Sequence, residues 1–244
     1  MENFFYSSLN YVYSTIVGND MRKIAWPALV STLIPPVVVT GTWLIAQSTW
    51  DQYNWMEQPI SDLAADDAPT QLWVSIAFLI GGTANIVTGV YARSFNMAAR
   101  IAFVLNGIFT YGLTYFTTPT QTTSSEEHRL FAVSAFAISA IWPILATRFD
   151  RRYSILIRPP GTIAATVVLL LMTTGLLFVW ISDDAQGIGL YQRIVGISQG
   201  LWPLIVVWWS YFHEQKLAED VLGGEPGVSE RAKDSNVGQL QNRI

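Results

Sequence analysis

Six apolar stretches of about 20 residues each constrain the folding of this chain more than any other feature. They lie at approximately 24–47, 72–92, 100–117, 130–147, 162–182 and 190–212. A helix of that length crosses a hydrocarbon core of about 30 Å. Hydrophobic residues make up 51% of the chain and charged residues 13%, about half the charged share of an average soluble domain. The sequence therefore predicts an all-α membrane protein with a bundle of six transmembrane helices.

The basic residues predict an orientation for this bundle. The chain has 14 Lys and Arg residues, and all except Arg129 and Arg193 lie before the first stretch, in every second loop after it, or beyond the last stretch. Loops rich in Lys and Arg remain in the cytoplasm. We therefore expect a multi-pass protein of the cell (plasma or inner) membrane, with both termini in the cytoplasm and short acidic loops outside.

The segments at the two ends of the chain differ from the apolar stretches. Residues 1–20 carry apolar side chains at helical spacing, which predicts an amphipathic helix lying at the membrane interface; a frayed leader is the alternative. Residues 21–217 hold the six-helix domain. Residues 218–244 are polar and lack apolar periodicity, so we expect them to form a mobile cytoplasmic tail.

Prolines and glycines predict local geometry within two of the stretches. Pro35 and Pro36 remove two backbone donors near the middle of the first stretch, where the helix should kink or unwind. Gly81, Gly82 and Gly89 in the second stretch should allow a neighbouring helix to approach closely.

Polar residues from several segments converge on the predicted outer side, where they are costly unless they are paired or hydrated. Ser61 and Asp62 in the first outer loop could cap a helix. Alternatively, this loop folds back over the bundle, and Asp62 pairs with Arg193 or His128 to close a polar pocket. The candidate ligand-binding residues of such a pocket are Ser61, Asp62, His128, Arg129, Gln192, Arg193 and Trp202.

Other kinds of site receive little support from the sequence. The chain has no cysteine, which excludes disulfides and thiolate metal sites, and one outer histidine with carboxylates is weak evidence for zinc. No Gly-x-Ser-x-Gly elbow surrounds Ser61. We expect no cofactor, no bound metal and no nucleic-acid partner. Within the stretches, Asn85, Asn106 and Gln199 are expected to hydrogen bond between helices.

Three sequence elements resemble a large bacterial family of six-helix membrane proteins, domain of unknown function 998. They are the segment Pro59-Ile60-Ser61-Asp62-Leu63, His128 at the start of the fourth stretch, and Gln192-Arg193 followed by Trp202. The resemblance covers roughly residues 24–212. The Ile-Ser-Asp element is also distantly similar to the eukaryotic Frag1/DRAM/Sfk1 group of six-helix proteins associated with lipid remodelling.

The chain departs from the bacterial pattern at one point. It has Thr118-Pro119-Thr120 where that family usually has Phe-Pro followed by an acid, so a role for an acid there does not carry over. The resemblance implies a fold and a set of outer-face residues but no activity.

The functional hypothesis that follows is non-enzymatic binding, handling or sensing of a membrane lipid or amphipathic molecule at the outer leaflet. Arg129 and Arg193 would supply positive charge for an anionic headgroup. One alternative is an accessory or structural subunit that packs against other membrane-protein subunits. Another is a membrane-embedded lipid hydrolase, with Ser61 as nucleophile and His128 as base. A secondary transporter is a further alternative, although no matching helix break appears in a second half of the chain.

Overall fold

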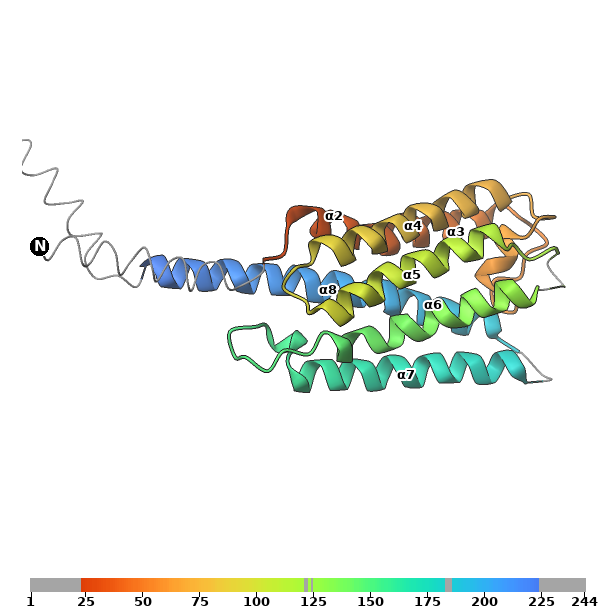
Figure 1. Ribbon diagram of the computed structural model, residues 1–244. Helices are drawn as coiled ribbons and strands as arrows, with labels where there is room; N and C mark the ends of the chain where they lie inside the picture. The colour runs from red at the N-terminus through yellow and green to blue at the C-terminus, as the bar shows by residue number, and fades with distance from the viewer. Residues whose placement is uncertain (1–22, 121–122, 124, 183–185, 224–244) are drawn as a thin grey trace, which may run out of the picture.

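The computed structural model describes residues 23–120, 123, 125–182 and 186–223, and each of the six apolar stretches is helical in it (Figure 1). The first stretch is made of α2 (Trp26–Ile34), η1 (Pro35–Val39) and α3 (Thr40–Ser48). The others are α4 (Gln71–Tyr91), α5 (Met97–Tyr115), α6 (Glu126–Leu145), α7 (Pro159–Ile181) and α8 (Ile188–Gly223). Two short 3-10 helices, η2 (Ile60–Ala64) and η3 (Ile155–Ile157), lie in connecting loops. The described residues form no β-strand.

All six helical stretches are long and apolar enough to cross a membrane, and the chain is a multi-pass membrane protein. Large apolar side chains are exposed along every stretch, among them Leu72, Leu130, Leu171 and Phe178. Patches of this extent are rare on soluble monomers. The predicted six-helix fold is confirmed.

The two predicted end segments lie largely outside the described residues. This applies to the whole of residues 1–20. At the other end, α8 continues to Gly223 and so extends into the segment predicted as a mobile tail. With 36 residues and a rise of 1.5 Å per residue, α8 is about 54 Å long. It projects well beyond the other helices (Figure 1).

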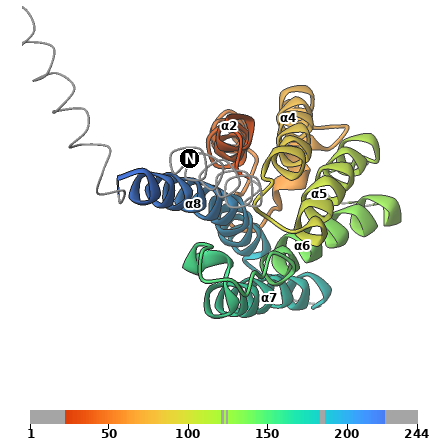
Figure 2. The same ribbon diagram turned by 60° about the vertical axis from the view of Figure 1, so that its left-hand side comes forward.

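The helices follow one another around the bundle in sequence order (Figure 2). From α4 to α8, each helix packs against the next, and α2 packs against both α4 and α8, which closes the ring. The main contacts of helix α7 are with α6, α8 and η3. The ring therefore surrounds an interior that side chains from α2–α3, α4, α5, α6 and α8 can reach.

The break predicted at Pro35 and Pro36 is present as a five-residue π-helix, η1. The two prolines lack the N–H donors that an α-helix would direct to Ser31 and Thr32. The N–H of Thr40 instead bonds the carbonyl of Pro35, and the Thr40 hydroxyl donates to the same carbonyl at 3.3 Å. This widened turn interrupts the α-helical hydrogen bonding of the first stretch, and the helix continues beyond it as α3.

Glycines allow α4 and α5 to pack with their backbones nearly in contact. A Cβ atom added at Gly82 would lie 2.9 Å from the carbonyl oxygen of Gly107, and one added at Gly107 would lie 2.6 Å from Cγ1 of Ile86. A Cβ added at Gly89 would likewise lie 2.6 Å from the carbonyl oxygen of Arg100 on α5. The close approach predicted from the small residues of the second stretch is confirmed.

Candidate functional site

The loop between α3 and α4, residues 49–70, folds back across one end of the bundle, and we call it the cap loop. Its backbone and side chains bond the start of α8: Leu190 N–H donates to Met56 O at 3.0 Å, and Gly187 N–H donates to Glu57 Oε2 at 2.6 Å. Gly189 packs so tightly that an added Cβ would lie 2.9 Å from Met56 O. Helix η2 lies within this loop and contacts α3, α4 and α8.

This arrangement decides between the two sequence interpretations of Ser61 and Asp62. Neither η2 nor α4 has a side-chain cap at its N-terminus, so these residues do not act as helix caps. The loop instead covers the bundle. The Ile60 N–H donates to the side-chain oxygen of Gln192 on α8, and the Thr70 hydroxyl donates to Leu63 O at 2.7 Å.

Arg193 on α8 is 3% exposed and fastens the cap loop to the bundle. Its guanidinium donates to Gln47 Oε1 at 3.1 Å, to Gln58 O at 3.1 Å and to the Tyr53 hydroxyl at 2.7 Å. It also bonds the carbonyl of Gly189 in its own helix at 2.9 Å. Its Cζ lies 5.2 Å from the centre of the Trp43 ring. Four of the five N–H groups of the Arg193 guanidinium thus donate to acceptors within the protein.

Asp62 is also buried, with 6% of its surface exposed. Asp62 forms no ion pair within 4 Å with any described residue. Among those residues, Arg152 and Asp150 make the one such pair. The direct pairing of Asp62 with Arg193 or His128 considered from the sequence is therefore wrong. The pKa of the Asp62 carboxyl is raised from 3.8 to about 7, mainly by burial and also by the negative charge of Asp67, while Arg193 opposes the shift. Burial likewise raises the pKa of the Tyr53 hydroxyl to about 12, against the effect of Arg193.

Directly beneath η2 lies a cavity of about 170 Å³, which we call the mouth cavity. It brings together three of the candidate residues from three separate elements: Ser61 from η2, His128 from α6 and Gln192 from α8. The rest of its lining is Pro35, Val39, Thr40, Trp43, Ile60, Phe78, Leu113, Ala132, Phe136 and Gly196. Polar groups therefore lie at the loop-covered end of a largely apolar space.

His128 is 4% exposed and is held in one orientation. Its backbone N–H bonds the hydroxyl of Ser125, the N-cap of α6, at 3.1 Å. Its Nδ1 lies 2.7 Å from Phe116 O. A carbonyl can only accept, so Nδ1 carries the proton and Nε2 is the acceptor in the neutral ring. No hydrogen bond joins Ser61 to His128 in the described part of the chain, and so the geometry gives no specific support to a Ser–His nucleophile.

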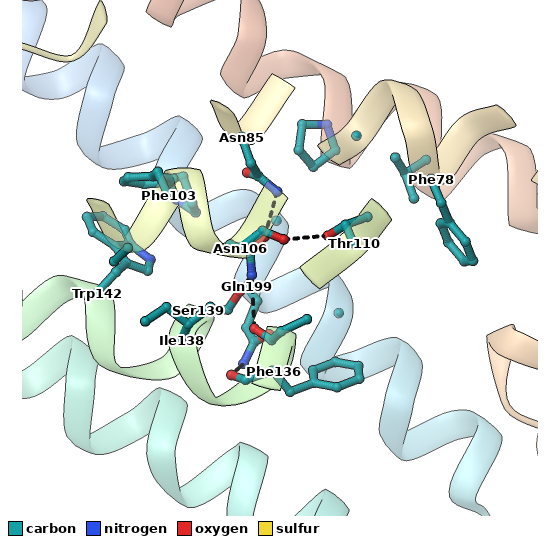
Figure 3. A pocket seen from close by; sticks show the side chains of 18 of the residues that line it. Phe78, Asn85, Phe103, Asn106, Thr110, Phe136, Ile138, Ser139, Trp142 and Gln199 are labelled. Carbon is teal, nitrogen blue, oxygen red and sulfur yellow. Dashed lines mark hydrogen bonds between the residues drawn. The ribbon is translucent and has the colours of Figure 1, made fainter. Parts of the chain in front are cut away.

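A second cavity, of about 200 Å³, lies deeper in the bundle, and we call it the central cavity. Figure 3 looks into it and shows the carboxamides of Asn85, Asn106 and Gln199 gathered in its middle. Asn85 Nδ2 donates to Asn106 Oδ1 at 2.7 Å. Asn106 Nδ2 donates to Ala135 O at 2.9 Å and to the Ser139 hydroxyl at 2.7 Å. The inter-helix bonds expected of these amides are present, and the same amides line the cavity.

The two cavities adjoin each other. Six residues line both: Pro35, Val39, Phe78, Leu113, Phe136 and Gly196. Gly196 on α8 has no atom within 4 Å of the position where a Cβ would stand. The π-helix contributes Pro35 and Val39 to the shared wall. We call the two adjoining cavities together the passage; hydroxyl, imidazole and amide groups line its mouth, and carboxamides line its inner part.

Four of the seven candidate residues lie elsewhere. Asp62 and Arg193 lie beside the mouth cavity without lining it. Arg129 is exposed on the first turn of α6. Trp202 packs with the core cluster at the opposite end of the bundle, so it does not belong to a pocket under the cap loop.

Several residues of the site were missed by the sequence reasoning. Tyr53 and Gln47 hold Arg193, Ser139 anchors Asn106, and Gly196 borders both cavities. A tyrosine in the loop and a glycine within an apolar helix are weak signals that could have drawn attention to two of them. No group of three or more His, Cys, Asp or Glu side chains in the described part of the chain is placed to hold a metal ion.

Comparison with known proteins gives one match. A family profile described as "Protein of unknown function (DUF998)" matches residues 33–209, which include both cavities and the cap loop. Neither the comparison with curated proteins nor that with solved structures gives a match.

Proposed function

We propose that this chain, which belongs to the DUF998 family of proteins of unknown function, binds a lipid or other amphipathic molecule inside its helix bundle. The observation that carries this proposal is the pair of adjoining cavities, which share six lining residues. Their shared wall is apolar, whereas Ser61, His128 and Gln192 line the end beneath the cap loop. Ligand sites commonly combine a mainly apolar lining with a few oriented polar groups.

The cap loop would retain the ligand, because it closes the mouth of the passage. Arg193 and Gln192 fasten this loop to α8. On the orientation expected from the basic residues, the mouth lies at the outer leaflet of the membrane. Because Arg193 is committed to the loop, the polar contacts to the ligand come from neutral groups and His128.

A cavity-filling variant tests this proposal. Gly196→Leu places a branched side chain in the space shared by both cavities, where an added Cβ meets no atom within 4 Å. The variant should fold, since replacing glycine within a helix also removes a propensity penalty of about 1 kcal/mol. Gly175→Leu is the matched control: it lies in α7, also has no atom within 4 Å, and lines neither cavity.

The measurement is native mass spectrometry of protein extracted in mild detergent. We expect bound lipid-sized mass on the wild type and on Gly175→Leu, and its loss from Gly196→Leu. Equal occupancy in all three proteins contradicts binding within the bundle. Absence of any bound molecule from the wild type, together with no thermal stabilisation by added membrane lipid extract, contradicts the proposal altogether.

A further inference from the structure

We infer that the ligand is uncharged and enters the passage with a hydroxyl group leading, which the carboxamides of the central cavity bind in the interior of the bundle. The inference rests on the proposed function and specifies the chemistry of its ligand. It comes from a count of the hydrogen-bonding groups that the bundle itself leaves unused.

Asn85 and Gln199 both have spare hydrogen-bonding capacity. A carboxamide has two N–H donors and one oxygen acceptor. Asn85 uses one N–H, on Asn106. Gln199 uses both, on Phe136 O at 3.1 Å and on the Thr173 hydroxyl at 2.9 Å. Within the described part of the chain, the oxygens of both side chains and the second N–H of Asn85 have no partner.

Burial makes this spare capacity informative. Gln199 is 8% exposed, and an unsatisfied polar group at such a position is unfavourable. The carboxamides of the central cavity thus leave two oxygen acceptors and one N–H donor for a guest. A hydroxyl group satisfies both kinds because it donates one hydrogen bond and accepts others.

The lack of charged side chains in the described lining of the central cavity excludes ligands with a charged head group. The described residues lining the central cavity include no Asp, Glu, Lys, Arg or His. A phosphate or carboxylate there would have no cation to pair with, and an ammonium would have no carboxylate. Transferring an unpaired ion from water to such a site is strongly unfavourable. A neutral hydroxyl can enter the site without that penalty.

The passage is also long enough to separate two ends of a ligand. Gln192 at the mouth and Gln199 in the central cavity are seven residues apart on α8, which corresponds to about 10 Å along the helix axis. An isoprenoid alcohol has the required combination of a flexible apolar chain and one terminal hydroxyl.

The experiment uses three probes with the same branched carbon skeleton: farnesol, farnesyl monophosphate and the saturated hydrocarbon farnesane. Binding to the full-length protein in detergent is titrated by thermal shift and by native mass spectrometry at pH 8. Because two hydrogen bonds to the hydroxyl are involved, we expect farnesol to bind about tenfold more tightly than farnesane. Farnesyl monophosphate should bind at least tenfold more weakly than farnesol.

Two variants test whether the central cavity is the source of the preference for farnesol over farnesane. Asn85→Leu removes one of the two carboxamides that bind the hydroxyl, so the preference for farnesol over farnesane should fall from about tenfold to about threefold, with farnesane binding unchanged. Thr83→Val is the matched control, because Thr83 lies on the same helix, bonds Tyr111 on the exposed side at 2.8 Å, and does not line the central cavity. The control should keep the tenfold preference.

The outcomes separate this inference from the proposed function. If farnesol and farnesane bind equally well, or the phosphate binds most tightly, and Gly196→Leu abolishes that binding, then the passage is a ligand site but the hydroxyl inference is wrong. If none of the probes binds, or if Gly196→Leu leaves their binding intact, the proposed function fails together with the inference. An equal fall of the preference in Thr83→Val and in Asn85→Leu also overturns the inference.

Discussion

Asp62 should make the stability of the folded protein depend on pH in an unusual direction. The pKa of its carboxyl is raised by burial from 3.8 to about 7, so the folded protein keeps a proton that the unfolded chain releases near pH 4. Between these values the folded state binds more protons, and stability therefore falls as pH rises. The contribution is fully favourable below about pH 4, and it is lost by the time the pH exceeds 7.

The size of this effect follows from the pKa difference. One unit corresponds to about 1.4 kcal/mol, so ionising Asp62 lowers the free energy of unfolding by on the order of 4 kcal/mol. Water that enters beside the carboxylate reduces this figure. Asp62→Asn removes the charge with little change of shape. The variant should be more stable than the wild type by a few kcal/mol at pH 8.5 and nearly equal to it at pH 4.5.

Thermal unfolding in a single detergent at these two pH values measures the effect. Asp51→Asn is the control, since Asp51 is an exposed acid of the same loop. It should keep the pH dependence of the wild type. If the wild type and Asp62→Asn change in parallel from pH 4.5 to 8.5, the carboxyl ionises freely in the folded protein and the reasoning from burial is refuted.

Two further predictions concern packing and are checked by the same unfolding measurement. Arg193→Met should lower the free energy of unfolding by on the order of 3 kcal/mol because it leaves buried carbonyl groups without donors. Arg193→Lys should restore less than half of that loss, since an ammonium lacks the planar fork of a guanidinium. Unchanged stability of Arg193→Met contradicts the role of Arg193 in fastening the cap loop. Gly107→Ala should lower stability by about 1–3 kcal/mol through overpacking against Ile86, whereas Gly175→Ala should raise it by up to about 1 kcal/mol. Equal stability of the two alanine variants contradicts the close α4–α5 contact.

The transmembrane fold could be predicted from the sequence because its determinants are local. Length and hydropathy define each helix, and the prolines at 35 and 36 define the break in the first stretch. Gly82 predicted a close helix contact because a missing side chain leaves room for a neighbour wherever it packs. Each of these features acts through its own segment of the chain.

The partners of Arg193 could not be predicted in this way. Opposite charges attract, which favoured Asp62 as the partner of Arg193. The guanidinium instead donates its hydrogen bonds to the hydroxyl of Tyr53, the side-chain oxygen of Gln47 and backbone carbonyls. Every residue has a carbonyl, so the sequence does not indicate which one is used. Ser61, His128 and Gln192 line one cavity in the structure, and their shared position at helix or loop ends on the same side of the bundle is what the sequence indicated.

The cavities themselves were not predicted, because they result from the space that remains once the helices have packed. Gly196 looks in the sequence like any small residue of an apolar helix. Only the positions of α4, α5 and α6 show that the space beside it is empty. Similarly, Asn85 and Asn106 were correctly expected to bond across helices, but their unused groups become apparent only when every bond is known.

The uncharged lining of the central cavity has an electrical consequence. Moving one elementary charge across a membrane potential of 100 mV involves about 2.3 kcal/mol. The described residues that line this cavity contain no ionisable group, so a neutral molecule that moves along it, and the amides that reorient around it, transfer no net charge through the field. Occupancy of the central cavity by a neutral ligand should therefore be the same in energised and in depolarised membranes.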